Sequence, residues 1–331
     1  MKVSKLLFCL VIFSSVAIAQ RSDRTYLFQV LSNGKTGFID KSGKLVFTTN
    51  FEVLGDFQDG LCRARKIDGQ SSSKLGFIDQ TGKMVIEARF NSASDFSDGL
   101  AAVSLDGELF GFIDPNGRMV IEPQFRQIAV FSEGLARVDD AGKSGYIDKT
   151  GRFIIAKKFD QAGDFKEGLA WVSVGPMTGF IDKSGEIVIA PSFAEALWFS
   201  EGLATVRLSR DGLWGYIDKT GQIVIKPQFR SAYPFSEGLA RVSVNEKFGF
   251  IDQSGKAVVP AQFDLADDFA NGLAAVSRNG LWGYIDRTGK FVIQPQFVFA
   301  GSFARSLASV STERTLGYID RNGKYVWKSS R

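Results

Sequence analysis

Two pairs of adjacent carboxylates are the residues whose type and spacing most directly suggest catalysis. They are Asp139-Asp140 and Asp267-Asp268. Carboxylates on either side of a glycosidic bond can hydrolyse it, one as acid and the other as base or nucleophile. Successive side chains on a strand point to opposite faces, however, and both pairs lie beside turns. The spacing therefore does not favour a catalytic pair.

Nine further aspartates recur in the motif Gly-[Phe/Tyr]-Ile-Asp and could form a ladder of calcium ligands, since calcium prefers carboxylate oxygens. Each also begins the sequence Asp-x-x-Gly, in which the carboxylate caps a tight turn. Turn capping explains the pattern without a cation. The nine residues are Asp40, Asp79, Asp114, Asp148, Asp182, Asp218, Asp252, Asp286 and Asp320.

Other catalytic and metal-binding chemistry lacks its usual side chains. The chain has no His, which is the commonest general base and zinc ligand. Cys62 takes the place of an Ala in most other copies, such as Ala101 and Ala136, which indicates a small packed residue. The glycines follow turn spacing and do not form a phosphate-binding G-x-G-x-x-G before a helix. We therefore predict no enzymatic activity, no cofactor and no metal.

A position that varies between copies is a stronger indication of a binding surface. The Leu, Ala and Val around it hardly change, as a core requires. A position that accepts Arg, Trp and Thr is expected to be exposed, and repetition would align these side chains along one face. Arg and Trp are also enriched at recognition hot spots. The position holds Arg63, Ala102, Arg137, Trp171, Thr205, Arg241, Ala275 and Ser309.

Trp198 is a second departure from the repeating pattern. Its place is held elsewhere by an aspartate, such as Asp56, Asp95, Asp164 or Asp268. The alternative is that both Trp171 and Trp198 fill local packing gaps. The candidate ligand surface consists of Arg63, Arg137, Trp171, Trp198, Thr205 and Arg241.

The elements that must position these residues belong to a unit repeated nine times. Turn signals every 8 to 12 residues or so, between short β-branched and aromatic runs, indicate strands. They would interrupt both helices of a helical repeat of the same period. The motif recurs at intervals of 34 to 39 residues, at Gly37, Gly76, Gly111, Gly145, Gly179, Gly215, Gly249, Gly283 and Gly317.

Each unit is predicted to be a three-stranded antiparallel meander. Leu239 to Val242 is typical of the first strand, Trp214 to Ile217 of the middle strand and Ile223 to Lys226 of the last. Asp-Gly and Asn-Gly dipeptides tolerate positive φ and so favour two-residue hairpins between first and middle strands. These dipeptides are Asp106-Gly107, Asp211-Gly212 and Asn279-Gly280.

A Pro-Gln-Phe segment follows the last strand, as in Pro227 to Phe229. We expect the proline to end strand pairing, because it has no N–H to donate. The next unit brings a second phenylalanine about six positions later, as in Phe235. We expect the two rings to pack between neighbouring units.

These units resemble the WG repeat family of bacterial proteins. The resemblance is carried by Trp214 to Asp218 and Trp282 to Asp286, with Ile-x-Pro-Gln-Phe and Phe-x-Glu-Gly-Leu-Ala downstream, and it extends from Tyr26 to about Trp327. It implies an interaction repeat without a general enzymatic activity. Seven of the nine units replace the tryptophan that gives the family its name, with Thr36, Leu75, Phe110, Ser144, Thr178, Phe248 and Leu316.

The chain ends bear on how the units are arranged. The first unit begins with its own first strand, Tyr26 to Val30, and the ninth ends with its own last strand, Tyr325 to Trp327. No strand is therefore borrowed across the ends, although closed propellers often use such borrowing. We favour an open, superhelical array in which each unit contacts its neighbours. The alternative is a closed, propeller-like ring.

Residues 1–19 are predicted to be a secretory signal, and residues 20–331 a single repeat domain. Lys2 and Lys5 precede an apolar run, and Ala17-Ile18-Ala19 forms a cleavage site before Gln20. Loss of the two lysines lowers the formal charge from +4 to +2. No basic stripe indicates nucleic acid. We expect export to the periplasm or the cell exterior, without stable membrane insertion after the signal is removed.

Two functions remain open for such a chain. The first is a non-enzymatic interaction or scaffold surface for a protein partner. The second is binding of a glycan or cell-wall polysaccharide, with Trp171 and Trp198 stacked on sugar rings. Exposed aromatic side chains in line would favour the glycan, whereas an apolar patch rimmed by Arg would favour the protein.

Overall fold

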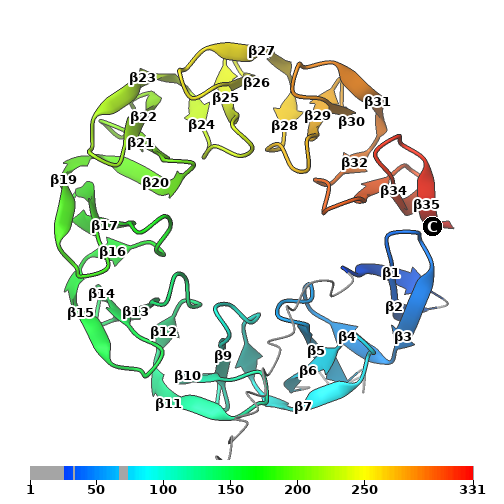
Figure 1. Cartoon of the computed structure of the whole chain (residues 1–331), viewed down its shortest axis with the longest axis horizontal. Helices are drawn as coiled ribbons and strands as arrows, with labels where there is room; N and C mark the ends of the chain where they lie inside the picture. The colour runs from blue at the N-terminus through cyan, green and yellow to red at the C-terminus, as the bar shows by residue number, and fades with distance from the viewer. Residues whose placement is uncertain (1–25, 33, 67–73, 331) are drawn as a thin grey trace, which may run out of the picture.

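Nine small antiparallel sheets stand side by side around a ring and form the blades of a β-propeller (Figure 1). The structure is a computed structural model that describes residues 26–32, 34–66 and 74–330. The predicted all-β tandem repeat is confirmed. The open array that we favoured is wrong, and the closed ring is correct. The predicted signal, residues 1–19, lies outside the described residues.

The blades are numbered along the chain, and each is described from the centre of the ring outwards (Figure 1). Among the described residues, blade 1 contains three strands, and blades 2 to 9 contain four. The innermost strands of blades 2 to 9 are β4 (Phe51–Val53), β8 (Ser92–Ala93), β12 (Gln127–Ile128), β16 (Gln161–Ala162), β20 (Glu195–Ser200), β24 (Ser231–Ala232), β28 (Leu265–Ala266) and β32 (Phe299–Ala300). The next strands of blades 1 to 9 are β1 (Phe28–Ser32), β5 (Leu61–Lys66), β9 (Ala101–Ser104), β13 (Ala136–Asp140), β17 (Ala170–Val174), β21 (Leu203–Arg207), β25 (Ala240–Val244), β29 (Ala274–Arg278) and β33 (Ala308–Ser311).

The two outer strands of each blade carry the repeated motif and the rim of the ring. The motif strands are β2 (Lys35–Ile39), β6 (Leu75–Asp79), β10 (Phe110–Ile113), β14 (Lys143–Ile147), β18 (Met177–Ile181), β22 (Trp214–Asp218), β26 (Lys247–Ile251), β30 (Leu281–Ile285) and β34 (Thr315–Ile319). The rim strands are β3 (Leu45–Thr49), β7 (Met84–Phe90), β11 (Met119–Phe125), β15 (Phe153–Phe159), β19 (Ile187–Phe193), β23 (Ile223–Phe229), β27 (Ala257–Phe263), β31 (Phe291–Phe297) and β35 (Tyr325–Ser330). Among the described residues, no helix is long and apolar enough to cross a membrane.

The structure differs from the predicted three-stranded unit in two ways. It adds a short innermost strand, and its rim strand extends further than the last strand that we predicted. In blade 6, β23 continues through Pro227, and Phe229 pairs with Trp214. Our expectation that proline ends the pairing is therefore wrong. The rim strand has a partner on one side alone, so a residue without an N–H is tolerated there.

One of the three predicted two-residue hairpins is confirmed. Arg278 pairs with Leu281 across Asn279-Gly280, both of which have positive φ. Asp106-Gly107 and Asp211-Gly212 lie instead in longer loops, between Ser104 and Phe110 and between Arg207 and Trp214. The dipeptides thus predicted the positions of these turns correctly, but the turns are longer than two residues.

The motif glycine is required where the rim strand bulges against the motif strand. A Cβ added to Gly215 would lie 2.5 Å from the carbonyl oxygen of Ile225 and 2.7 Å from the nitrogen of Pro227. The register shifts at this point of β22 and β23, as it does in other blades. Because the obstructing atoms are backbone, any side chain in place of Gly215 would force the backbone to move.

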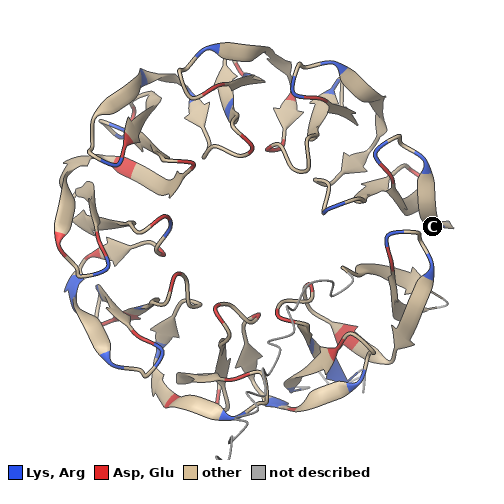
Figure 2. Cartoon of the chain, in the orientation of Figure 1, with Lys and Arg blue, Asp and Glu red and all other residues tan. Residues whose placement is uncertain are grey.

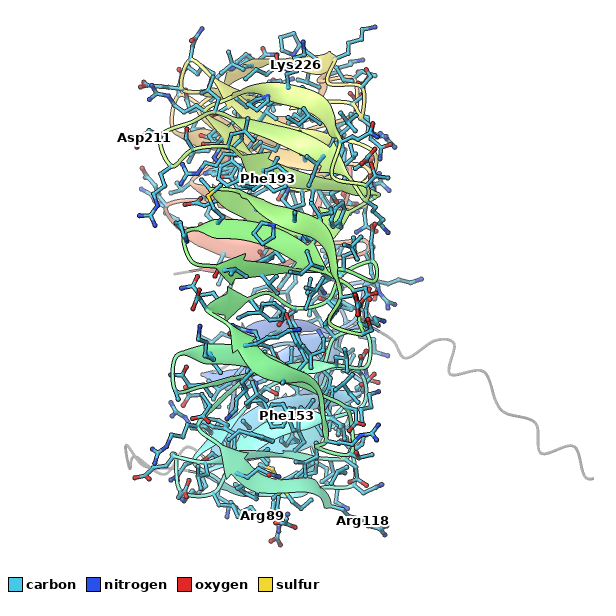
Figure 3. The ribbon with its side chains drawn as sticks, turned by 90° about the vertical axis from the view of Figure 1, so that its left-hand side faces the viewer. Arg89, Arg118, Phe153, Phe193, Asp211 and Lys226 are labelled. Atoms are coloured by element: carbon cyan, nitrogen blue, oxygen red, sulfur yellow. The ribbon has the colours of Figure 1, made fainter. Side chains whose placement is uncertain are left out.

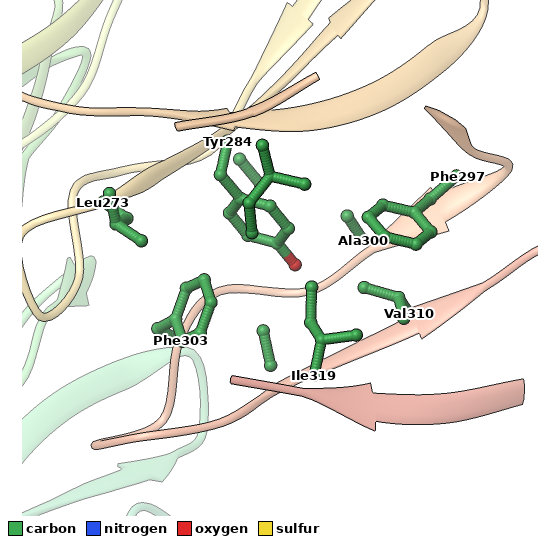
Figure 4. Close-up of a cluster of buried hydrophobic side chains, with 10 residues drawn as sticks. Leu273, Tyr284, Phe297, Ala300, Phe303, Val310 and Ile319 are labelled. Carbon is green, nitrogen blue, oxygen red and sulfur yellow. The ribbon is translucent and has the colours of Figure 1, made fainter. Parts of the chain in front are cut away.

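The hydrophobic core lies between blades rather than inside one. Figure 4 shows the cluster between blades 8 and 9, in which Tyr284 and Phe297 of blade 8 meet Ala300, Phe303 and Ile319 of blade 9. Equivalent clusters join the other blades. Burial of apolar area against the next unit is the main stabilising term in such an array. The expected packing of Phe229 and Phe235 between units is thus confirmed.

An aromatic pair marks every blade interface, including the one that closes the ring. Ring centroids lie 4.6 to 5.3 Å apart, mostly in edge-to-face geometry. Such pairs contribute about 0.5–1.5 kcal/mol each beyond their buried area. The pairs are Phe38 with Phe57, Phe77 with Phe96, Phe112 with Phe131, Tyr146 with Phe165, Phe180 with Phe199, Tyr216 with Phe235, Phe250 with Phe269, Tyr284 with Phe303, and Tyr318 with Phe28.

The ring closes by side-chain packing of blade 9 on blade 1. Among the described strands, β1 pairs with β2 and β35 pairs with β34, so the two blades exchange no strand. Tyr318 donates its hydroxyl to the carbonyl oxygen of Gln29 at 2.9 Å, and Phe28 and Val30 pack on Leu307. Borrowing of a strand is therefore not needed for closure.

Acidic turns line the inside of the ring (Figure 2). In blades 3 to 7 the turn carboxylate accepts a hydrogen bond from a glycine N–H of the next blade. Glu201, for example, binds the N–H of Gly238 at 2.8 Å. Blade 9 has Arg305 at this place, and its guanidinium lies 5.3 Å from the ring centre of Tyr26 in blade 1. The turn thus carries a positive charge in place of a negative one at the interface between blades 9 and 1, where the ring closes.

The ring has two distinct faces, which Figure 3 shows edge-on. One carries the loops that join the second strand of each blade to the motif strand, including Asp211; we call it the hairpin face. The other carries the Asp-x-x-Gly turns. There, Oδ1 of Asp218 accepts the N–H groups of Thr220 and Gln222, so the predicted turn capping is confirmed. No cluster suited to a metal ion occurs among the residues that the structure describes.

Candidate binding site

Ionic contacts between consecutive blades define the place where the site forms. The second strand of each blade carries the position that varies between copies, which is Trp171 in blade 5. This side chain faces the next blade, at the position that Trp198 holds in blade 6. Three interfaces hold an arginine and an aspartate there. Arg63 lies 2.7 Å from Asp95, Arg137 lies 4.0 Å from Asp164, and Arg241 lies 3.1 Å from Asp268.

The interface between blades 5 and 6 replaces both members of this ion pair with tryptophan. Trp171 on β17 takes the place of the arginine, and Trp198 takes the place of the aspartate. Trp171 is half-buried against the core cluster between the two blades, whereas Trp198 is 45% exposed. The exchange turns an ionic contact into a pair of large aromatic surfaces.

Gly163 makes room for the indole of Trp171. A Cβ at this position would lie 2.1 Å from Nε1 of Trp171. The equivalent residue is Tyr233 in blade 7 and Asp267 in blade 8. The glycine and the tryptophan therefore belong to one local arrangement.

Both tryptophans line a pocket of about 670 Å³ between blades 4, 5 and 6. Its volume falls in the range of ~300–1,000 Å³ that is common for small-molecule sites. The rest of the lining is mostly polar and lies mainly at the hairpin face. The polar side chains are Arg126, Gln127, Arg137, Asp139, Asp140, Lys143, Ser144, Asp160, Gln161 and Asp164.

Cations on the same blades already pair with the carboxylates of this pocket. Nη1 of Arg137 lies 3.0 Å from Asp139, and Nζ of Lys143 lies 2.6 Å from Asp160. The hydrogen bond from Lys143, with that from the N–H of Gly175, holds the pKa of Asp160 below its ordinary value. The carboxylate of Asp160 is thus fixed in orientation and ionised at neutral pH.

A second pocket, of about 520 Å³, adjoins the first. The two share Asp160, Gln161 and Trp171. The remainder of the second lining comes from blades 5 and 6, including Glu195 and Arg210. Trp171 therefore stands between two hollows on one side of the ring.

The structure brings three of the six predicted surface residues into one site. Arg137, Trp171 and Trp198 line the first pocket together. Arg63 and Arg241 lie at other interfaces, between blades 2 and 3 and between blades 7 and 8.

The predicted exposed ladder is wrong. Thr205 is fully buried, and the side chains of Arg63, Arg137 and Arg241 are 26%, 29% and 16% exposed. The variable position faces the next blade rather than solvent. Where the residue is arginine, the next blade supplies an aspartate as its partner.

The other candidate residues have structural contacts. Asp139 pairs with Arg137, Asp140 with Lys157, and Asp268 with Arg241. Burial raises the pKa of Asp267, and Arg241 opposes this shift. Each of these aspartates thus has a cationic neighbour.

Cys62 is buried and unpaired, as its place in the repeat predicts. Its Sγ lies 3.1 Å from the carbonyl oxygen of Gly55. Burial raises the pKa of its thiol to about 12. A thiol with so high a pKa is almost wholly protonated at neutral pH and is a poor nucleophile.

Sequence reasoning missed the polar wall of the site. Lys143, Asp160, Gln161 and Gly163 were not predicted as site residues. A signal existed in the chain, because arginine in one unit recurs with aspartate in the next, and tryptophan with tryptophan. Reading it requires the knowledge that these two places face each other across a blade interface.

Solved structures match this chain at low sequence identity. The crystal structure of a eukaryotic initiation factor matches with a TM-score of 0.65 and 10% identity, over 93% of this chain and 96% of that chain. BamB from Moraxella catarrhalis matches with a TM-score of 0.47 and 13% identity, over 80% and 90%. Virginiamycin B lyase from Staphylococcus aureus matches with a TM-score of 0.38 and 14% identity, over 67% and 90%. No curated protein sequence matches significantly.

The repeat itself identifies the family. The WG containing repeat matches eight segments, which are residues 37–69, 76–108, 110–143, 145–175, 179–209, 214–248, 248–282 and 282–313. These segments cover most of the chain and follow the period of the blades. The chain therefore belongs to the WG repeat family.

Proposed function

We propose that this protein is an exported, non-catalytic propeller that binds carbohydrate in the pocket between blades 4, 5 and 6. The observation that carries the proposal is the presence of Trp171 and Trp198 in one pocket with oriented carboxylates. The proposed export rests on the predicted signal in residues 1–19. The proposed lack of catalysis rests on the absence of His from the sequence and on the ion pairs of the aspartates.

Indole surfaces and fixed hydrogen-bond acceptors are what a sugar ring needs. One face of a pyranose presents C–H groups that pack on an aromatic plane, while its hydroxyl groups lie around the edge. Trp171 and Trp198 offer large apolar surfaces with one polar N–H each. Asp160 and Gln161 offer acceptors and donors in the same pocket.

The test is binding of the mature protein to insoluble polysaccharides, with Trp198→Ala as the variant. Trp198 is 45% exposed, so its removal should leave the fold intact. We expect the variant to lose at least about tenfold in affinity, as for a hot-spot aromatic residue. Phe299→Ala is the matched control, because Phe299 is 51% exposed on blade 9, away from the pocket.

The proposal is contradicted if Trp198→Ala retains full affinity. It is also contradicted if the parent protein binds no polysaccharide of the native cell envelope. Unfolding curves of both variants should match that of the parent protein. This check separates loss of the site from loss of the fold.

A protein partner is the second candidate. Leu265, Val298 and Phe299 are each about half exposed at the inner side of blades 8 and 9. Exposed apolar side chains on neighbouring elements are typical of protein interaction sites. A pull-down from the native envelope that depends on Phe299 and not on Trp198 would favour this function.

A further inference from the structure

We infer that the carbohydrate is a linear, uncharged oligosaccharide that lies across Trp171 and occupies both adjoining pockets at once. This inference rests on the proposed function. It adds the length and the charge of the ligand, neither of which follows from one pocket alone.

The length follows from how the two pockets meet. They share Asp160, Gln161 and Trp171, so no other blade separates them. A ligand confined to the first pocket would leave one side of Trp171 without a partner. A chain of sugar rings that passes over the indole can instead contact Trp198 on one side and Leu197 and Glu195 on the other.

The charge follows from the ion pairs around the two hollows. The carboxylates of Asp139, Asp140 and Asp160 have lysine or arginine partners, and Glu195 pairs with Arg207 at 2.5 Å. A cationic sugar would have to compete with these pairs. Two further arginines line the pockets, Arg126 and Arg210, and both are exposed, where solvent screens their charge. Neither a positive nor a negative charge on the ligand therefore adds much binding free energy. Hydroxyl and amide groups of the ligand are the favoured contacts.

Trp171 is held in position by the space that Gly163 leaves. A methyl group at Gly163 would collide with the indole at 2.1 Å, and the φ of Gly163 is not positive, so alanine fits its backbone. Gly163→Ala therefore displaces the tryptophan without removing it. Blade 9 offers a matched control, because a Cβ at Gly301 meets only the Ser309 hydroxyl closely, at 2.8 Å.

The first experiment measures affinity against chain length by calorimetry. The probes are cello-oligosaccharides and N-acetylated chito-oligosaccharides of one to six rings, with oligogalacturonates of matched length as acidic counterparts. We expect affinity for one uncharged series to rise at least about tenfold between the disaccharide and the longest oligomer, because two sites joined by one ligand bind it more tightly. The acidic series should not bind more tightly, and added salt should change little.

The second experiment blocks the second pocket alone. Ala194 lines it, and the equivalent positions in blades 4 and 7 hold Arg126 and Arg230, so the fold accepts Ala194→Arg. This variant should bind the disaccharide normally and lose the gain with length. Gly163→Ala should weaken binding at every length, whereas Gly301→Ala should not.

The outcomes separate this inference from the proposed function. Binding that depends on Trp198 but is equal for short and long oligomers, or unaffected by Ala194→Arg, overturns the two-pocket ligand and leaves carbohydrate binding intact. Tighter, salt-sensitive binding of oligogalacturonates overturns the uncharged ligand. Absence of binding to polysaccharide and to all the oligosaccharides overturns both.

Discussion

At the scale of single residues, the two tryptophans of the site stood out in the sequence, but their relation to each other did not. Trp171 and Trp198 take the two places that hold an arginine and an aspartate at three other interfaces. Because the two residues belong to different units, only the packing of blade 5 on blade 6 brings them to one pocket. Thr205 was misplaced for the same reason: its side chain lies inside a blade interface and is fully buried.

The turn aspartates give a prediction on pH. A hydrogen bond from the Thr220 hydroxyl, with backbone N–H groups, lowers the pKa of Asp218 from 3.8. Since the pKa falls on folding, the carboxylate stabilises the fold fully above the unfolded pKa, and this contribution is lost as the pH falls through the folded pKa. Asp218→Asn should therefore lower the urea midpoint at neutral pH, and the difference should shrink well below pH 3.8.

The control for this prediction is Asp211→Asn, which changes an exposed aspartate in a loop of the hairpin face. It should leave the urea midpoint nearly unchanged at both pH values. An equal loss in the two variants, or a loss for Asp218→Asn that persists unchanged in acid, would reject ionised turn capping as the cause.

At the scale of elements, turn residues and alternating strands made three of the four strands of a blade predictable. The innermost strand was missed because it is only two residues long, too short for any pattern, in six of the eight blades for which the structure describes it. Pro227 was misread for a physical reason. Its missing N–H matters only where a neighbouring strand would accept it, and the rim strand has no neighbour on its outer side.

The motif glycine gives a prediction at this scale. Gly215→Ala places a Cβ against the backbone of the bulged rim strand, 2.5 Å from the Ile225 carbonyl oxygen. We expect the free energy of unfolding to fall by about 1–3 kcal/mol, because the backbone of the rim strand must move. In Gly37→Ala, the Cβ would meet only side chains, the nearest being Leu45 at 3.0 Å. Chemical denaturation of both variants checks this, and equal losses would contradict it.

At the scale of the whole molecule, the sequence predicted the number of units but not that they form a ring. The absence of strand exchange was taken to favour an open array. Closure also uses an aromatic pair, Phe28 of blade 1 with Tyr318 of blade 9, but Phe28 lies on the second strand, whereas at most other interfaces the equivalent ring, such as Phe235, lies between the innermost and second strands. Phe28 lies at a position that holds Cys62 or Ala136 in other blades. A single phenylalanine in place of a small residue was therefore the sequence signal for closure.

Closure gives the last prediction. Phe28→Ala should remove the aromatic contact with Tyr318 and part of the packing on Leu307. We expect a loss of about 3–5 kcal/mol, typical of a buried phenylalanine. Hydrogen exchange should then accelerate in β34 and β35 as well as in β1 and β2, although these segments lie at opposite ends of the chain. Phe235→Ala is the internal control and should accelerate exchange around blades 6 and 7 instead.

The two variants differ in what they reveal about the ring. An open array has no contact between blade 1 and blade 9, so Phe28→Ala would leave the exchange of β34 and β35 unchanged. In the closed ring, blades 1 and 9 protect each other from hydrogen exchange through the contact of Phe28 with Tyr318 and the hydrogen bond from Tyr318 to Gln29. Because no described strand crosses this interface, its strength depends mainly on side-chain contacts. We therefore expect the ring to open first between blades 9 and 1 under mild denaturant, before any other interface separates.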